Sequence, residues 1–389
     1  MIDNLIKEFE KVYFSHISST KGIENLAKNI GISKNSLRRF LGKIKSDSNL
    51  RISTLNLIAE RMGYHNFQDF CESHGRKYTL DFTLLEIYYG TVKGQEPSLS
   101  ENRFQKANYY FAEKIISDPE NLKEFVKRFA QNEEALEYVL AWHPSYEKIA
   151  QKSYQHALNT VAKISTKAHI KVFAQAFIYF GRFMSEEMEL QESGKLLNQL
   201  KKSVHRMRLE SNTFHAFPEA RFMVAKCIDY KMRNDTQELS AELRREIAMH
   251  HVTNATFRDR FIYRTFVTNI LNILQDYDNA DLCFKDQFSD KEIVQFEAEN
   301  PAYRVNIFLY RVNRAITLYH LGRKDEAVKI FNRVTENIHD AKTFSFDSKP
   351  YFELNYFYLA KKIFPARQDY QRRYDMLVDQ MNFIYLIGR

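Results

Sequence analysis

The stretch Ile23–Leu41, IENLAKNIGISKNSLRRFL, decides the fold of the first part of the chain. It predicts a helix, a tight turn and a second helix, because its apolar residues recur at helical spacing on both sides of the turn. Ala27 is small where two steeply crossing helices approach, and Gly31 tolerates the positive φ of a bend. Ser33 is placed to cap the second helix. The inward-facing positions are Ile23, Leu26, Ile30, Ile32, Leu37 and Phe40.

The outer side of the second helix carries cations and amides. Because Leu37 and Phe40 face inward, the residues that face outward are Lys34, Asn35, Ser36, Arg38 and Arg39. Long cationic and amide side chains on a short helix suit the major groove of DNA. The loop 42–50 is polar and basic, so Lys43 and Lys45 are expected to contact the DNA backbone. These seven residues are the predicted DNA contacts.

The segment Ile23–Phe70 resembles the lambda-repressor-like helix-turn-helix family of the xenobiotic-response-element type. The resemblance rests on eight positions that agree in spacing: Leu26, Ala27, Ile30, Gly31, Ile32, Leu37, Phe40 and Gly63. It implies a small helical domain that reads duplex DNA. Two alternatives stay open. The segment is a plain helical bundle with a solvated basic face, or a head that dimerises without binding DNA, as degenerate members of the family do.

Composition indicates an ordinary globular protein built from helices. The chain has 389 residues, of which 44% are hydrophobic and 27% charged, and its 11 Gly and 7 Pro are few. Scarce helix breakers and little alternation of apolar and polar residues favour an all-α fold. At this length we expect two or three domains.

The charge distribution points to a polyanionic partner. The formal net charge is +8, and residues 21–51 hold eight Lys or Arg against two acidic residues, a local excess of +6. Release of counterions from DNA phosphates requires such a concentration of cations. Duplex DNA is therefore the first partner that we expect.

Three widely separated cysteines, Cys71, Cys227 and Cys283, lie in apolar helical contexts. Buried reduced thiols in a cytoplasmic protein are the expected state. The amino-terminal residues lack the pattern of a signal peptide, and no run of 18 apolar residues predicts a membrane span. We expect a cytoplasmic protein without a membrane partner.

The rest of the chain predicts helix after helix. We place a DNA-binding domain at residues 1–77 and a second domain at 78–389, with the break near Gly75. Helices of 15–20 residues joined in pairs by short turns are typical of an α-solenoid; a generic helical bundle is the alternative. The longer amphipathic stretches lie near residues 167–185, 192–207, 216–233, 236–250, 255–276, 303–321, 324–338, 349–363 and 367–386.

One helical pair matches the tetratricopeptide pattern. In NRAITLYHLGRKDEAVKIF, the small residues Ala315 and Ala327 allow two helices to approach, Gly322 lies in the turn, and Phe331 fills the groove toward the next repeat. The first half of the motif is degraded, because Arg311 and Arg314 replace its usual Trp and Leu. The remaining pairs are expected from helix length alone.

No catalytic constellation stands out in the sequence. There is no P-loop, no G-x-S-x-G, no HExxH and no paired CxxC. The adjacent His250 and His251 point about 100° apart on a helix, so they do not share a metal ion easily. We therefore expect no enzyme activity, no cofactor and no metal.

Polar residues on apolar helices of the second domain are the candidate effector contacts. Asn306 and Asn313 are seven residues apart and share a helix face, with Tyr310 and Arg314 near it, and Asn269 projects similarly from another helix. Amides on the concave face of a helical array can bind a peptide backbone, and arginine can hold a carboxylate. Hydrogen bonds between helices are the alternative role for these side chains.

The two halves together resemble, in architecture, the peptide-pheromone-sensing regulators of Gram-positive bacteria and their phages. The resemblance implies a homodimeric transcriptional regulator whose helical-repeat domain binds a short peptide or a protein effector. The alternative is a non-enzymatic interaction scaffold, encoded by a phage or other mobile element, whose head does not read DNA. A hidden enzyme in the helical array is a third alternative, which the absence of clustered motifs disfavours.

Overall fold

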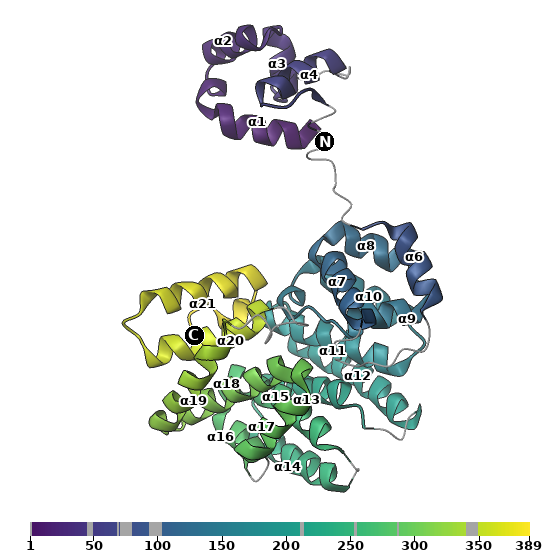
Figure 1. The fold of residues 1–389 in the computed structure, drawn as a ribbon, viewed down its shortest axis with the longest axis vertical. Coiled ribbons are helices and arrows are strands. Elements are labelled where there is room, and N and C mark those ends of the chain that lie inside the picture. Colours follow the sequence, from purple (N-terminus) through teal and green to yellow (C-terminus); the bar gives the residue numbers. More distant parts are fainter. Residues whose placement is uncertain are drawn as a thin grey trace. The chain divides into compact units, whose positions relative to one another are not determined.

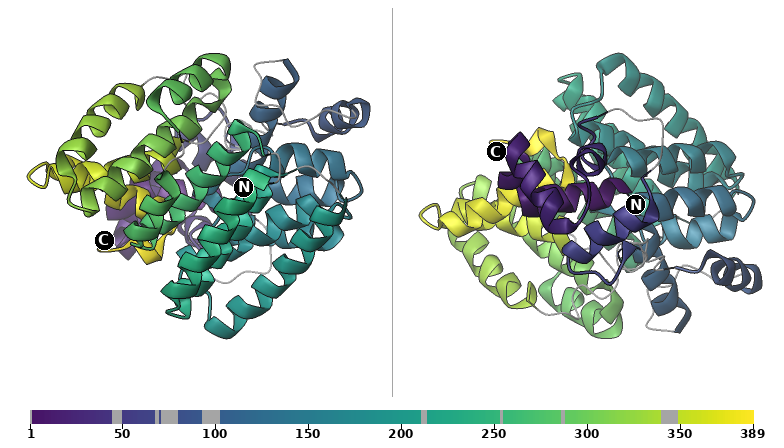
Figure 2. Two further views of the ribbon diagram at one scale, coloured as in Figure 1. Left: turned by 90° about the horizontal axis from the view of Figure 1, so that it is seen from below. Right: turned by 90° about the horizontal axis from the view of Figure 1, so that it is seen from above.

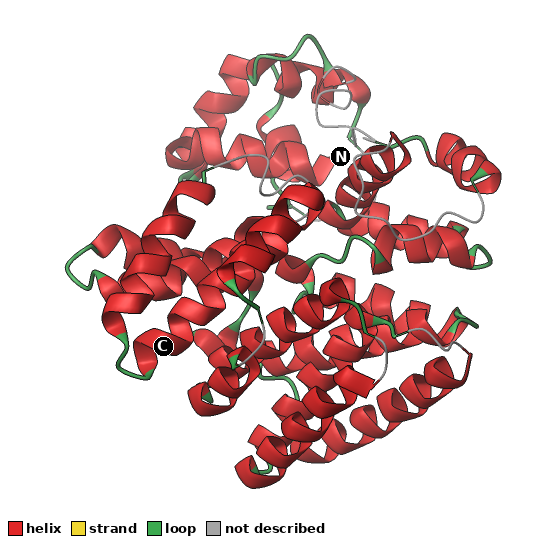
Figure 3. Cartoon of the chain, turned by 60° about the horizontal axis from the view of Figure 1, so that its bottom comes forward, coloured by secondary structure: helices red, strands yellow, loops and turns green. Residues whose placement is uncertain are grey.

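The structure is a computed structural model that describes residues 2–44, 50–67, 70, 80–92, 103–210, 214–252, 255–285, 288–339 and 349–389. All regular secondary structure in these ranges is helical (Figure 3), which confirms the predicted all-α class. The chain divides into two compact units, Met1–Asp81 and Phe82–Arg389, which we call the head and the body. Figure 1 labels their helices.

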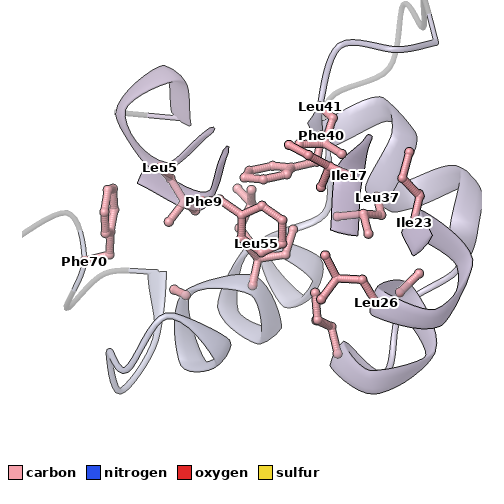
Figure 4. Close-up of a cluster of buried hydrophobic side chains, with 14 residues drawn as sticks. Leu5, Phe9, Ile17, Ile23, Leu26, Leu37, Phe40, Leu41, Leu55 and Phe70 are labelled. Carbon is pink, nitrogen blue, oxygen red and sulfur yellow. The ribbon is translucent and has the colours of Figure 1, made fainter. Parts of the chain in front are cut away.

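Four helices of the head are described. They are α1 (Ile2–Ile17), α2 (Thr20–Ile30), α3 (Lys34–Phe40) and α4 (Ile52–Arg61). The side chains of Leu5, Phe9, Leu26, Leu37 and Phe40 form its buried core together with Leu55, Ile58 and Phe70 (Figure 4). The rings of Phe9 and Phe40 pack edge to face with their centroids 5.4 Å apart. This contact holds α1 against α3.

The turn between α2 and α3 has the predicted chemistry. Gly31 has a φ of 84°, and the Ser33 hydroxyl accepts a hydrogen bond from the Ser36 backbone N–H at 3.0 Å. Gly63 ends α4 with a φ of 94°. Val12 of α1 and Ile52 of α4 have the helical spacing of the core residues of their helices, but they are 59% and 71% exposed.

The described helices of the body fall into an initial group and a longer run of pairs. The initial group consists of α6 (Phe82–Thr91), α7 (Arg103–Ser117), α8 (Pro119–Arg128), α9 (Glu133–Leu136), the π-helical turn η1 (Glu137–Ala141), the 3₁₀ turn η2 (Tyr146–Lys148) and α10 (Lys152–Ile164). The run that follows consists of α11 (Ala168–Met184), α12 (Leu190–Glu210), α13 (Ala216–Met232), α14 (Thr236–Val252), α15 (Phe257–Ile273), α16 (Tyr277–Phe284), α17 (Asp290–Glu299), η3 (Pro301–Tyr303), α18 (Arg304–His320), α19 (Lys324–Asn337), α20 (Lys349–Ile363), α21 (Gln368–Met381) and η5 (Ile384–Leu386).

Two rows of helices make up the second part of the body. In the first row α11, α13, α15, α18 and α20 pack each against the next. In the second row α12, α14, α16, α19 and α21 each pack against the first-row helix that precedes them. The sequence of colours in Figure 2 follows this order from teal to yellow. The predicted stretches match these helices closely, but α16 and α17 were not anticipated because they are short.

The pair α18–α19 has the features that its sequence predicts. Ala315 and Ala327 are fully buried, and Gly322 has a φ of 84° in the turn. The Phe331 ring stacks on Tyr356 of α20, with ring centroids 4.9 Å apart. Small residues thus let two helices approach, and the aromatic residue packs toward the next pair.

Segments distant in sequence meet in the interior of the body. Tyr146 of η2 stacks on Tyr351 of α20 at 4.8 Å and on Phe266 of α15 at 5.9 Å. The Arg221 guanidinium of α13 lies 3.9 Å from the Phe266 ring centroid and 4.7 Å from that of Tyr146. Aromatic stacking and cation–π contacts therefore connect η2 with α13, α15 and α20 of the first row.

Gly181 allows a close approach between α11 and the chain before α10. A Cβ at this position would collide with the Ile149 carbonyl oxygen and the Gln155 side chain. We expect Gly181→Ala to lower the free energy of unfolding by about 1–3 kcal/mol, because a packed interior accommodates no added methyl group without backbone shifts. Urea denaturation followed by circular dichroism measures the change.

Gly194 provides the matched control. It lies in α12, and nothing lies within 4 Å of a Cβ built there. Gly194→Ala should leave stability unchanged or raise it by up to ~1 kcal/mol, because alanine favours the helix. Equal shifts for both variants would show that the Gly181 contact does not constrain the fold.

Candidate nucleic-acid interface

The short helix α3 is held by its inner side and leaves its outer side to solvent. Leu37 and Phe40 are 0% and 1% exposed and anchor it in the head core. Among the predicted DNA contacts on this helix, Asn35 is exposed, and Lys34, Ser36, Arg38 and Arg39 are partly exposed. The residues expected to face outward therefore do so within the head, on a helix that is positioned by buried contacts.

The partners of these side chains differ. Lys34 Nζ donates to Glu24 Oε2 of α2 at 2.6 Å, and the hydroxyls of Ser36 and Ser33 are 2.8 Å apart. Arg39 interacts within the chain. Arg38 has no side-chain hydrogen bond or ion pair with any described residue. Arg38 is thus the cation of α3 that is best placed to bind an external acceptor.

Glu24 places one negative charge on this otherwise basic side of the head. Its hydrogen bond with Lys34, and the charge of that lysine, lower the pKa of the Glu24 carboxyl. The carboxylate is therefore ionised at neutral pH and offsets the charge of Lys34. Because Lys34 is partly exposed and Glu24 is exposed, the pair can exchange for contacts with an external ligand at little cost.

The loop lysines are not equivalent to the lysine and arginines of α3. Lys43 Nζ donates to the Ile17 carbonyl oxygen at 2.6 Å, so it caps the end of α1. An ammonium group keeps two further donors in this arrangement, which leaves it able to contact a phosphate. Lys45 lies outside the described residues.

The predicted peptide-binding amides lie inside the body. Asn269 and Asn313 are 2% and 0% exposed. Asn269 Nδ2 donates to Asn313 Oδ1 at 3.1 Å and to Asn355 Oδ1 at 2.8 Å, and Asn313 Nδ2 donates to the Thr265 carbonyl oxygen at 3.0 Å. In this structure the amides join α15, α18 and α20 and do not line an open surface. The hydrogen bonds are of the inter-helix kind, which was the alternative interpretation.

The other three candidates are also engaged or enclosed. Asn306 is 3% exposed and Tyr310 is 2% exposed, and burial raises the pKa of the Tyr310 hydroxyl to about 12. Its ring packs 4.8 Å from that of Phe261. Arg314 Nη1 lies 3.7 Å from Asp290 Oδ1 on the surface. These residues do not line a common pocket. Asn306 and Tyr310 are buried where α18 packs against neighbouring helices, whereas Arg314 lies on the surface.

Two features of the body were not predicted from the sequence. Tyr351 and Asn355 of α20 complete the amide cluster, and the Tyr351 hydroxyl donates to Asn269 Oδ1. Their four-residue spacing gave no signal because the sequence does not show that both residues face Asn269 of α15. The second feature is a set of exposed cations on α12, for which the signal was the absence of acidic residues between Glu192 and Glu210.

Among the described residues no group of three or more His, Cys, Asp or Glu side chains is placed to hold a metal ion. In the same part of the chain no helix combines the length and the apolar character needed to cross a membrane. Cys227 and Cys283 are buried free thiols, and Cys71 lies outside the described residues.

The chain was compared with known proteins in three ways. No protein-family model matches the sequence, no curated protein matches it, and no solved structure matches the fold.

Proposed function

We propose that the chain is a DNA-binding transcriptional regulator. The head is a helix-turn-helix domain that reads duplex DNA with α3, and the body is a tetratricopeptide-like helical array that binds a peptide or protein effector. The observation that carries the proposal is the anchored helix α3, whose outer side presents Lys34, Asn35, Arg38 and Arg39 to solvent within the head.

Charge and geometry support this assignment of the head. Residues 21–51 hold most of the excess positive charge of the chain. Direct reading of bases in the major groove uses Arg, Lys and Asn side chains, and the phosphate contacts around them fix the register. A single head contacts few base pairs, so the proposal includes a homodimer with two heads about 34 Å apart.

The two rows of the body support the proposed array of helical pairs. A ligand that prefers one curvature of such an array shifts the population of that state by its differential affinity. The buried amides at Asn269 and Asn313 are not part of the proposed effector site, because they are satisfied by each other and by neighbouring helices.

An interaction scaffold is the second candidate. The ion pair between Lys34 and Glu24 and the bond from Lys43 to Ile17 favour it, because both use cations of the head within the head. Such a scaffold would have no enzyme activity and would not require DNA.

Binding to a random-sequence duplex at increasing salt separates the two candidates. For a DNA-binding regulator we expect the logarithm of the affinity to fall with the logarithm of salt concentration with a slope of about −3 or steeper, since each phosphate contact contributes about −0.9. Fluorescence anisotropy with a labelled duplex measures the slope. A scaffold should give weak binding that salt leaves unchanged.

A further inference from the structure

One helix carries nearly all the excess positive charge of the body. Residues 82–389 have a formal net charge of +4, and α12 alone contributes +3. Between Glu192 and Glu210 the sequence SGKLLNQLKKSVHRMRL has five Lys or Arg and no Asp or Glu. The remainder of the body is therefore close to neutral, and α12 is where a polyanion would be attracted.

The buried side of α12 fixes which residues point outward. Leu197, Leu200, Val204 and Met207 are buried against the body. Every Lys and Arg of the helix is exposed, as are Asn198, Gln199 and His205. The cations from Lys195 to Arg208 extend over about 20 Å at 1.5 Å per residue. At 3.6 residues per turn Lys195, Lys202 and Arg206 share one side of the helix. Lys201 and Arg208 lie on the side that borders α13.

Some of these cations are already neutralised and some are not. Arg206 pairs with Glu210 at 2.6 Å, and Arg208 pairs with Glu219 at 2.6 Å. Lys195, Lys201 and Lys202 make no ion pair in the part of the chain that the structure describes. Interaction with the helix dipole does not explain these lysines, because it is confined to the last turn.

A hollow lies between α12 and α13. It has a volume of about 270 Å³ and is lined by Lys201, His205 and Arg208 on one side and by Lys226 and Arg233 on the other. Lys226 pairs with Glu242 and Arg233 with Asp229, so this side is balanced in charge. The unpaired charge lies on α12.

We propose that the exposed side of α12 is a second contact surface for the phosphate backbone of duplex DNA, independent of base sequence. Phosphate contacts are made by Lys, Arg, Asn and Gln side chains, which are the types exposed here. A protein partner fits less well, because interfaces between proteins have an apolar centre. On α12 the large exposed apolar residues are Leu190 and Leu209, one at each end.

This proposal goes beyond the proposed function, which assigns DNA contacts to the head alone. It requires α12 to be exposed in the body, and it holds whether or not α3 reads bases. The two proposals can therefore fail separately.

The test uses the full-length protein and a labelled random-sequence duplex of about 20 base pairs. The variant Lys195→Ala/Lys201→Ala/Lys202→Ala removes the three unpaired cations of α12. We expect it to make the salt slope shallower by about 2–3, since each phosphate contact contributes about 0.9. If the slope is shallower by 2.7, the loss of affinity between about 50 and 200 mM salt is roughly 40-fold smaller.

The control variant is Lys123→Ala/Lys291→Ala/Lys329→Ala, which removes three exposed lysines from α8, α17 and α19. It has the same net charge as the α12 variant. Equal changes in slope for the two triple variants would overturn the proposal, since they would report net charge alone. An unchanged slope for the α12 variant would overturn it as well.

Two further measurements separate the other outcomes. A labelled deca-glutamate peptide is the probe for an acidic protein partner; if the α12 variant lost affinity for this peptide and kept it for DNA, an acidic protein would replace DNA as the ligand. In Arg38→Ala/Arg39→Ala, the contribution of α12 to the slope should persist. If the head substitutions left DNA binding unchanged while the α12 variant weakened it, the proposed function of the head would fail and this inference would stand.

Discussion

Replacing Arg38 and Arg39 together by alanine should reduce affinity for duplex DNA by about 100-fold or more. Each contact of an arginine with a base edge is worth about 1–3 kcal/mol, and a phosphate contact adds to the salt dependence. Arg38 has the largest expected share, because no described residue pairs with it. Retention of the protein on immobilised duplex fragments, measured at about 100 mM salt, checks the prediction.

The control for this double variant is Lys7→Ala/Lys11→Ala. Both lysines are exposed on α1, and their replacement removes the same amount of charge from the head. The head should stay folded in both variants, because Leu37 and Phe40 hold α3 through its other side. Circular dichroism and the melting temperature verify this. Retention of the α3 variant at the level of the α1 variant would reject α3 as the reading helix.

Much of the head could be predicted because its determinants are local. A small residue at Ala27, a glycine at position 31 and a capping serine at position 33 act within a few residues of each other. Val12 and Ile52 are exposed although their spacing matches that of the core, because apolar spacing alone does not show whether a neighbouring helix covers the side chain. The ion pair between Lys34 and Glu24 was not predictable either, since it depends on the angle at which α2 and α3 cross.

Helix positions in the body were predictable, but the roles of its polar residues were not. The periodicity located α18 and α19 within one or two residues. Spacing placed Asn306 and Asn313 on one face without showing what faces them. For Asn313 that depends on Asn269 and Thr265 of α15, which are 44 and 48 residues away along the chain. A buried amide and an amide on a binding surface look alike until these partners are known.

The amide cluster gives the second large expected effect. Asn313→Ala should lower the free energy of unfolding by about 2–4 kcal/mol. It removes the bonds to Asn269 and to the Thr265 carbonyl oxygen and leaves a small cavity between α15 and α18. Urea denaturation followed by far-ultraviolet circular dichroism measures the shift. Asn332→Ala on the exposed side of α19 is the control and should change stability by less than about 0.5 kcal/mol.

A second substitution distinguishes lost hydrogen bonds from lost volume. Asn313→Asp keeps the shape of the side chain but replaces the donor that faces the Thr265 carbonyl oxygen with an acceptor. At neutral pH it also buries a carboxylate at a position that is 0% exposed. We expect it to destabilise at least as much as alanine, and to recover stability as the pH falls and the carboxyl becomes protonated. The outcome decides between two roles for this amide. A residue that binds an effector from an open surface would tolerate both substitutions without loss of stability, whereas a residue that joins α15 to α18 would tolerate neither.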